Sequence, residues 1–243
     1  MQTHTFGGLT ARVLGGTDGE GGGDGPVVVL LHGFGAGGDD LVPFGRELRL
    51  PQAVRFVFPA APISFSMGNG YGESRAWWMI DMERLQRALM LGQHREMARE
   101  VPDGMAPARE KLIACLDDVE RALRVPPGQM VLGGFSQGAM LSCDLALRTD
   151  RPLAGLVLLS GTLLAEQEWT PLVKRRAGLK VFMSHGQQDP LLPFAASERL
   201  RDLLAGAGAN VEFVPFRGQH EIPMPVVSKM RTFLGAVLTP AVR

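Results

Sequence analysis

The chain has 243 residues, 45% hydrophobic and 21% charged, which predicts one soluble domain over residues 1–243 with a large core. Its 25 Lys and Arg balance 25 Asp and Glu without any basic block, which argues against a nucleic-acid partner. We expect a cytoplasmic protein with no transmembrane segment, because no apolar run approaches the roughly 18 residues of a membrane span and the N-terminus lacks a charged leader followed by an apolar core.

Strand-like and helix-like segments alternate along most of the chain. The glycine-rich stretch TDGEGGGDG, residues 17–25, is expected to be a flexible connection between two strands, without regular structure. The run VVVLLHG that follows is continuously apolar, as in a strand covered on both faces. Similar runs begin at Val54, Met130, Leu153, Leu179 and Val211. The predicted helices lie between them, at 39–48, 106–123, 138–147, 194–204 and 225–238. This alternation predicts an α/β fold with a mostly parallel central sheet flanked by helices.

Residues 77–101 interrupt the alternation with an additional helical pattern. Its apolar members recur at the spacing of one helix face, namely Trp78, Met82, Leu85 and Leu89. The sequence leaves two interpretations open for this stretch: a small cap-like helical insertion around 77–104 that covers an active site, or a helix that packs on the core.

The patterns of metal and nucleotide sites are missing from the sequence. Cys115 and Cys143 lie in predicted helices without paired spacing, so we expect buried free thiols and no disulfide. The chain has no H-E-x-x-H motif, and the turn HGFGAGG after the first apolar run matches neither G-x-G-x-x-G nor G-K-[ST]. We therefore expect no catalytic metal and no cofactor.

One serine occupies a position typical of a nucleophile. In parallel α/β sheets, ligands bind beyond the carboxyl ends of the strands. Gly-Phe-Ser-Gln-Gly at residues 134–138 matches G-x-S-x-G, in which a sharp strand-to-helix turn exposes the serine hydroxyl. The pattern alone is weak in a chain with 31 glycines, but here a strand-like run precedes it and a helix-like run follows. We predict that Ser136 is the nucleophile.

A serine nucleophile needs a base and an anion that orients the base. His220 follows the apolar run that begins at Val211, and its alternative role is that of a loop histidine. Asp189 follows the run that begins at Leu179, and its alternative role is an Asx turn or helix cap. The chain order Ser136, Asp189, His220 is that of the α/β hydrolases, and it predicts a catalytic triad.

The oxyanion formed during acyl transfer needs preorganised N–H donors. We expect them in the backbone amides of Gln137, at the start of a helix, and Phe34, in the turn HGFGAGG. His32 and His185 are each followed by glycine at the end of a strand, and we expect both to be structural hydrogen-bonding residues.

Seven segments occur in order from about Val27 to near the C-terminus: LLHGFGAGGDDL, FPAAP, SRAWWMID, GGFSQGAM, LLSG, HGQQDPLLPF and FRGQHEIP. In this combination the chain resembles the bacterial phospholipase/carboxylesterase family of α/β hydrolases, which is related to the acyl-protein thioesterases. The resemblance implies an α/β-hydrolase fold and a serine esterase without a cofactor that acts on short to medium acyl esters, lysophospholipids or acyl thioesters. It implies the same triad and the same two oxyanion donors.

The chain departs from the family pattern where the acyl pocket is expected. Trp77-Trp78-Met79 replaces the commoner single tryptophan followed by tyrosine, and the stretch 81–104 is longer than in the compact thioesterases. The residues that could line an apolar pocket are Phe65, Met67, Tyr71, Trp77, Trp78 and Met82. Most of them could instead belong to the core.

The expected partner is a small-molecule ester or thioester substrate, and a homodimer is compatible with the sequence. The function favoured is a serine carboxylesterase. The alternatives are a lysophospholipase or acyl-thioesterase with the same triad, and a hydrolase-like binding module without turnover, since fold alone does not fix function.

Overall fold

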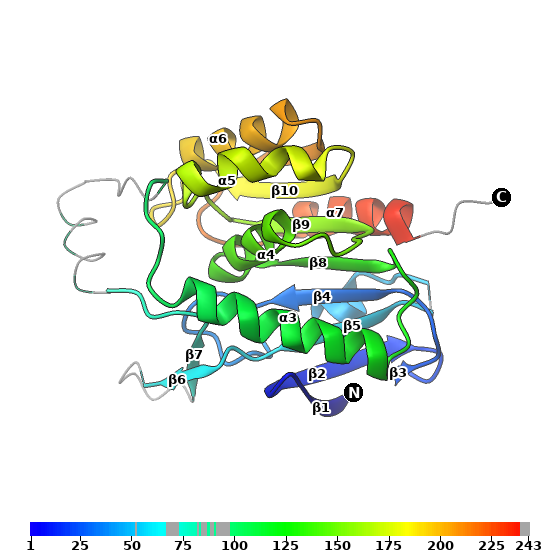
Figure 1. Ribbon diagram of the computed structural model, residues 1–243. Coiled ribbons are helices and arrows are strands. Elements are labelled where there is room, and N and C mark those ends of the chain that lie inside the picture. Colours follow the sequence, from blue (N-terminus) through cyan, green and yellow to red (C-terminus); the bar gives the residue numbers. More distant parts are fainter. Residues whose placement is uncertain are drawn as a thin grey trace.

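The computed structural model of the chain describes residues 1–51, 53–66, 73–81, 83, 87, 90 and 98–238. Within this part, a nine-stranded sheet lies at the centre of the molecule (Figure 1). Most of its strands run parallel, in the spatial order β5, β4, β8, β9, β10, β11. They are β4 (Val27–Leu31), β5 (Arg55–Pro59), β8 (Met130–Phe135), β9 (Gly155–Leu159), β10 (Lys180–Gly186) and β11 (Asn210–Phe216). These are the strands that the apolar runs predict.

The N-terminal strands extend this sheet at one edge. β2 (Leu9–Gly16) pairs antiparallel with β5, and β1 (Gln2–Phe6) pairs antiparallel with β2. A separate small sheet consists of β6 (Ile63–Phe65) and β7 (Ser74–Ala76), which the sequence patterns do not predict. β7 leads directly into the Trp77-Trp78 pair.

The glycine-rich stretch 17–25 holds more regular structure than expected. It contains β3 (Glu20–Gly22), which pairs in parallel with the end of β2. The Asp18 carboxylate accepts hydrogen bonds from the amides of Glu20, at 2.8 Å, and Gly22, at 2.9 Å. This side-chain cap fixes the turn, so glycine content alone is a poor guide to flexibility here.

Helices cover both faces of the sheet, and Figure 1 shows α3 (Met105–Ala122), α4 (Gln137–Arg148) and α5 (Glu166–Leu172) over the near face. Their core also includes buried residues of α6 (Phe194–Gly206) and alternate residues of β4, namely Val27, Val29 and Leu31. The intervening residues, Val28 and Leu30, pack with α7 (Met224–Leu238) in a second cluster. Because both faces of β4 are buried, its sequence is continuously apolar.

The first predicted helix, over 39–48, is largely wrong, because the structure has only α1 (Phe44–Glu47) there. The residues before it form turns, in which the Val42 amide bonds to the Asp39 carbonyl oxygen and the Phe44 amide to that of Leu41. Pro43 has no N–H and occupies the N-cap of α1, so a helix through this position would lack one of its backbone hydrogen bonds.

The middle of the predicted cap-like insertion around 77–104 lies largely outside the described part, and the undescribed residues include Met82, Leu85 and Leu89. It stays a prediction.

The cysteine prediction is confirmed, since Cys115 and Cys143 are both free and buried. Burial raises the pKa of the Cys115 thiol to about 12, and a nearby Asp118 adds to the shift, so this thiol stays protonated.

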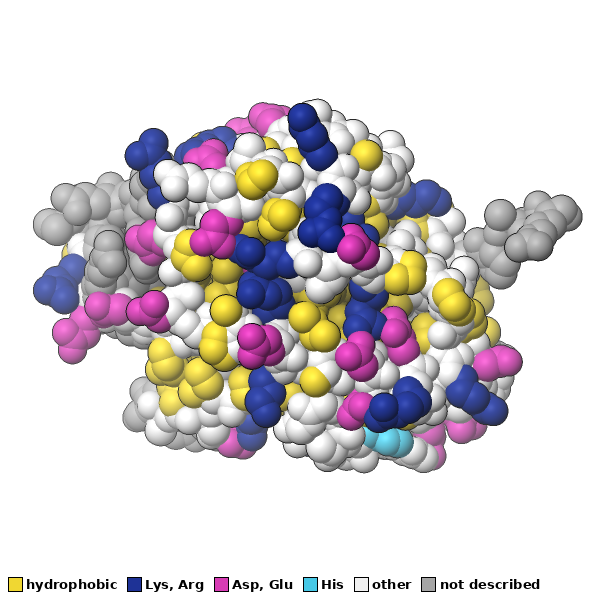
Figure 2. Space-filling view, in the orientation of Figure 1, with side chains coloured by type: hydrophobic (Ala, Val, Ile, Leu, Met, Phe, Trp, Pro, Cys, Tyr) yellow, Lys and Arg dark blue, Asp and Glu magenta, His cyan; other side chains and the backbone are white. Residues whose placement is uncertain are grey.

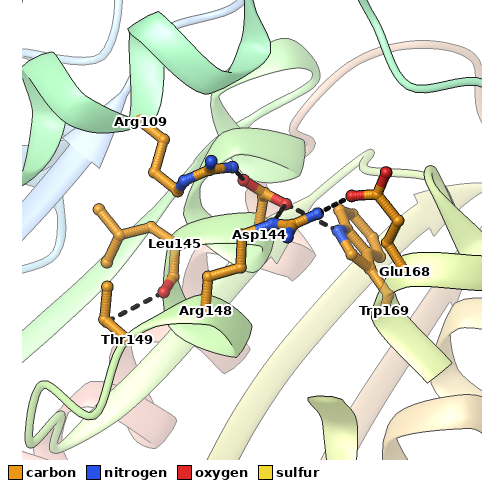
Figure 3. A network of polar contacts seen from close by, with 7 residues as sticks. All are labelled: Arg109, Asp144, Leu145, Arg148, Thr149, Glu168 and Trp169. Carbon is orange, nitrogen blue, oxygen red and sulfur yellow. Dashed lines mark hydrogen bonds and ion pairs between the residues drawn. The ribbon is translucent and has the colours of Figure 1, made fainter. Parts of the chain in front are cut away.

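The near face of the molecule carries interspersed basic and acidic side chains (Figure 2), in line with the balanced composition. Beneath it, the fully buried Asp144 of α4 binds partners from three helices (Figure 3). Its carboxylate accepts from Arg109 of α3 at 2.5 Å, from Arg148 at 2.7 Å and from the Trp169 indole of α5 at 2.8 Å. This network ties α3, α4 and α5 together.

Over the described ranges, none of the helices combines the length and the apolar character needed to span a membrane. The same ranges hold no group of three or more His, Cys, Asp or Glu side chains that could bind a metal ion.

Candidate active site

Ser136 lies at the sharp turn between β8 and α4, as the sequence predicts. Its backbone has φ 54° and ψ −117°, a conformation that non-glycine residues rarely adopt. The turn is fixed on both sides, because the Ser136 amide donates to the Leu159 carbonyl oxygen at 2.8 Å and the Met140 amide donates to that of Ser136 at 3.1 Å. The surrounding structure thus holds a strained residue at the carboxyl end of the sheet.

The two glycines of the motif are required by the close approach of β4. A Cβ atom built on Gly134 would lie 2.4 Å from the Leu31 carbonyl oxygen. One built on Gly138 would lie 2.2 Å from that same oxygen and 2.7 Å from the His32 carbonyl oxygen. All three distances are far below van der Waals contact, so any side chain at either position would push the turn away from β4.

Asp189 and His220 lie together beyond the ends of β10 and β11. His220 Nδ1 is 2.6 Å from Asp189 Oδ2. The other carboxylate oxygen, Oδ1, accepts from the amides of Leu191 and Leu192, each at 2.9 Å. The Asp189 side chain is fully buried, and that of His220 is 13% exposed. The carboxylate is thereby held rigidly, and the imidazole keeps one edge accessible.

The electrostatics around Asp189 favour its ionised form. Burial by itself would raise the pKa of this carboxyl, but hydrogen bonds from His185 and His220 outweigh burial, so the pKa of Asp189 lies well below its ordinary value. The Nε2 atom of His185 is 3.3 Å from Asp189 Oδ2. A buried carboxylate with these donors is an anion suited to orienting an imidazole.

The structure places His220 beside the turn that carries Ser136. The Phe135 ring, which precedes Ser136 in the chain, has its centroid 4.7 Å from that of the His220 imidazole. Across the described residues, the hydrogen bonds do not include one between the Ser136 hydroxyl and His220. Catalytic hydrogen bonds are often long without substrate and shorten when substrate binds. The structure thus brings Asp189 and His220 into contact and sets the turn that carries Ser136 beside the imidazole.

The predicted oxyanion donors belong to two segments that meet at Ser136. A Cβ atom built on Gly33 would lie 3.3 Å from Ser136 Cβ, so the turn that contains Phe34 passes alongside the serine. Gln137 begins α4, where amides have no helical acceptor. Within the described part of the chain, the amides of Phe34 and Gln137 donate to no protein acceptor, which leaves both N–H groups available.

His32 and His185 have the structural roles that the sequence predicts. His32 Nε2 accepts from the Ala61 amide at 2.9 Å, so the proton is on Nδ1, which donates to the Gly33 carbonyl oxygen at 2.8 Å. Burial lowers the pKa of His32 to about 4, so the ring is neutral near pH 7. His185 is fully buried, and its Nε2 lies 2.9 Å from the Leu192 carbonyl oxygen.

The predicted pocket residues fall into three groups. Phe65 is half-buried, and its ring centroid is 5.0 Å from that of Phe34. Trp77 and Trp78 are 1% and 3% exposed and pack in the core, the alternative that the sequence left open. Met67, Tyr71 and Met82 lie outside the described residues.

Sequence reasoning missed one polar contact beside the nucleophile. The side chain of Gln137 is fully buried and bonds to the backbone of Trp77 and Trp78. These partners are about sixty positions away in the chain, and no local pattern indicates such a contact.

Known proteins resemble this chain along most of its length. Acyl-protein thioesterase 1 of Neurospora crassa is 27% identical over 216 residues, which cover 86% of this chain and 85% of that protein. Acyl-protein thioesterase 1 of Gibberella zeae is 27% identical over 237 residues, which cover 88% and 91%. The crystal structure of esterase PE8 has a TM-score of 0.79 at 28% identity and covers 95% of this chain and 99% of its own.

The carboxylesterase of Bacillus cereus, at 23% identity, shares the fold with a TM-score of 0.70 over 94% of each chain. The sheet order and the flanking helices are those of an α/β hydrolase. The sequence profile of the Phospholipase/Carboxylesterase family matches residues 22–238. The chain therefore belongs to the phospholipase/carboxylesterase family of α/β hydrolases.

Proposed function

We propose that the chain is a serine carboxylesterase that hydrolyses short to medium acyl esters through an acyl-enzyme intermediate. Membership of its family makes it a carboxylic ester hydrolase. The observation that carries the finer proposal is the 2.6 Å contact between Asp189 and His220, beside the strained turn that carries Ser136. The proposal assigns Ser136 as the nucleophile, His220 as the base and Asp189 as the anion that orients the base.

In the proposed mechanism, Ser136 Oγ attacks the ester carbonyl carbon and its proton passes to His220 Nε2. The Nδ1–H group of His220 donates to Asp189, which stabilises the imidazolium. The amides of Phe34 and Gln137 bind the tetrahedral oxyanion. Collapse of this intermediate expels the alcohol, which takes the proton from His220. A water molecule then attacks the acyl carbon and passes a proton to His220, and collapse of the second tetrahedral intermediate releases the acid and returns that proton to Ser136 Oγ. None of these steps calls for a metal or an organic cofactor.

The serine and histidine assignments predict large losses of activity on mutation. Ser136→Ala and His220→Ala are expected to lower kcat on p-nitrophenyl butyrate by about 10⁴ to 10⁶. Ser228→Ala is a matched control, because this serine is exposed on α7. A fluorophosphonate probe should label Ser136 in the wild type, whereas a non-catalytic binding module would give no adduct. Retention of most activity in Ser136→Ala would refute the assignment.

A second candidate function is hydrolysis of acyl thioesters or lysophospholipids by the same residues. It is favoured by the relatives at 26–27% identity that are named acyl-protein thioesterase 1. Phe65, packed against Phe34 of the oxyanion turn, is an aromatic side chain that could contact an acyl group bound there. One acyl group offered as oxygen ester, thioester and lysophospholipid, followed by a series from acetyl to palmitoyl, would separate these substrate classes.

A cytoplasmic location, a homodimer and a cap formed by residues 77–104 stay predictions from the sequence. Cell fractionation and sedimentation velocity test the first two.

A further inference from the structure

The side chain of Gln137 makes a two-point contact with one neighbouring segment. Its Oε1 atom accepts from the Trp77 amide at 2.9 Å, and its Nε2 atom donates to the Trp78 carbonyl oxygen at 2.8 Å. Gln137 is fully buried, so water does not compete for either bond. The carboxamide thus uses its donor and its acceptor on consecutive residues, which fixes the Trp77-Trp78 segment relative to the first residue of α4.

The Trp77 side chain continues this connection to the turn that carries Phe34. The indole Nε1 donates to the His32 carbonyl oxygen at 3.0 Å, and Trp77 is 1% exposed. The His32 ring lies 5.6 Å from the indole between centroids, and its Nδ1 atom donates to the Gly33 carbonyl oxygen. The carbonyl groups of His32 and Gly33, the two residues before Phe34, are therefore both held by buried hydrogen bonds.

The same segment also contacts the far side of the Phe34 turn. The Gly35 amide donates to the Arg75 carbonyl oxygen at 2.9 Å, and the Arg75 amide donates to that of Ala36 at 3.1 Å. Residues 75–78 therefore bond to the Phe34 turn at one end and to Gln137 at the other. The two proposed oxyanion donors are joined through this one short piece of chain.

We propose that Gln137 and Trp77 are positioning residues whose side chains set the separation of the two oxyanion donors, the amides of Phe34 and Gln137. The inference rests on the proposed serine esterase function. Preorganised donors act on the charge that develops in the transition state, so a small displacement lowers kcat more than it changes KM. Trp77 then acts from within the core and has no direct contact with the acyl chain.

The test compares an ester with its thionoester, in which sulfur replaces the carbonyl oxygen. Donors placed for a small oxyanion serve the larger, weakly accepting sulfur poorly, so the wild type should strongly prefer the oxygen ester. A variant with displaced donors should lose rate mainly on the oxygen ester. Trp77→Phe removes the indole N–H, and Gln137→Met removes both carboxamide bonds at similar side-chain volume.

Trp169→Phe is the matched control. The Trp169 indole is also fully buried and donates to a buried acceptor, Asp144, but in the network that joins α3, α4 and α5 (Figure 3). We expect Trp77→Phe to lower kcat on the oxygen ester by about 10-fold or more, less than the loss of a whole donor, with KM changed by less than about 3-fold. The ratio of oxygen ester to thionoester activity should fall by the same factor. Trp169→Phe should lower Tm and leave that ratio unchanged.

Suppose that the wild-type Ser136 reacts with a fluorophosphonate, but that Trp77→Phe has the same ratio of oxygen ester to thionoester activity as the wild type. This result overturns the positioning role and leaves the esterase function standing. A wild type that takes up no probe overturns both. If either variant yields no folded protein, the kinetics of the other decide, because both changes act on the same link.

Discussion

His220 Nδ1 lies 2.6 Å from Asp189 Oδ2, while Asp189 Oδ1 accepts from the amides of Leu191 and Leu192. Each oxygen of the carboxylate therefore has its own partners, and the side chain cannot rotate without losing both backbone bonds. The imidazole is oriented by an acid whose own orientation is fixed by the following loop.

Because the two carboxylate oxygens of Asp189 have different partners, the effect of Asp189→Asn can be predicted. The asparagine carbonyl oxygen should stay with the amides of Leu191 and Leu192, which places its NH₂ group toward His220 Nδ1. The imidazole would then carry its proton on Nε2 and could not accept the proton of Ser136. We expect kcat on p-nitrophenyl butyrate to fall by about 10⁴, as for the same change in a serine protease triad, while circular dichroism shows an intact fold. A loss below about 10-fold would contradict the proposed role.

The backbone of Ser136 predicts that glycine stabilises this position relative to alanine. At φ 54° and ψ −117°, a Cβ atom is strained, and strain of this kind costs about 1–3 kcal/mol. Both Ser136→Gly and Ser136→Ala remove the hydroxyl, so their difference reports the backbone. We expect Ser136→Gly to be about 1 kcal/mol more stable in urea unfolding, even though glycine is normally the less stable of the two. If Ser136→Ala were instead the more stable variant, as is normal for alanine relative to glycine, the turn would be unstrained.

The approach of β4 to the nucleophile turn predicts that Gly138→Ala is severely destabilised. The added Cβ atom would lie 2.2 Å from the Leu31 carbonyl oxygen, a backbone atom that can move only with the whole strand. We expect a loss of more than about 3 kcal/mol, or no soluble protein. Gly206→Ala is the control, because a Cβ atom there meets no described atom within 4 Å, and its Tm should change little. Comparable stabilities would contradict this packing.

Local patterns predict the parallel strands well and the polar contacts poorly. β4 and its parallel neighbours are recognisable because burial on both faces leaves a run of apolar residues, whereas β3 depends on the carboxylate of a single residue, Asp18. The order of Ser136, Asp189 and His220 is visible because each follows such a run. The bond from the Trp77 indole to His32 joins residues 45 positions apart. The sequence offers Trp77 as a pocket residue or a core residue, and neither interpretation indicates where its N–H group donates.

His32 predicts a specific loss of stability in mild acid. Its pKa is lowered by burial from 6.5 to about 4, because the protonated ring would be nearly dehydrated in the core. Above pH 6.5 the ring is neutral in both the folded and the unfolded chain. Between pH 6.5 and 4 only the unfolded chain binds this proton, so the contribution of His32 to the free energy of unfolding falls as pH falls. The shift corresponds to roughly 3 kcal/mol over this range.

His32→Gln isolates this contribution, because glutamine offers a donor and an acceptor but does not titrate. Urea unfolding at about pH 7 and about pH 4.5 should show a loss that is roughly 2–3 kcal/mol smaller in the variant than in the wild type. Asp189 does not interfere: its lowered pKa gives stability that is fully present above the ordinary carboxyl value of 3.8 and is lost only in stronger acid. Equal losses in both proteins would show that His32 binds its proton as readily in the folded chain as in the unfolded one. The ring would then not be the buried neutral link between the Ala61 amide and the Gly33 carbonyl oxygen.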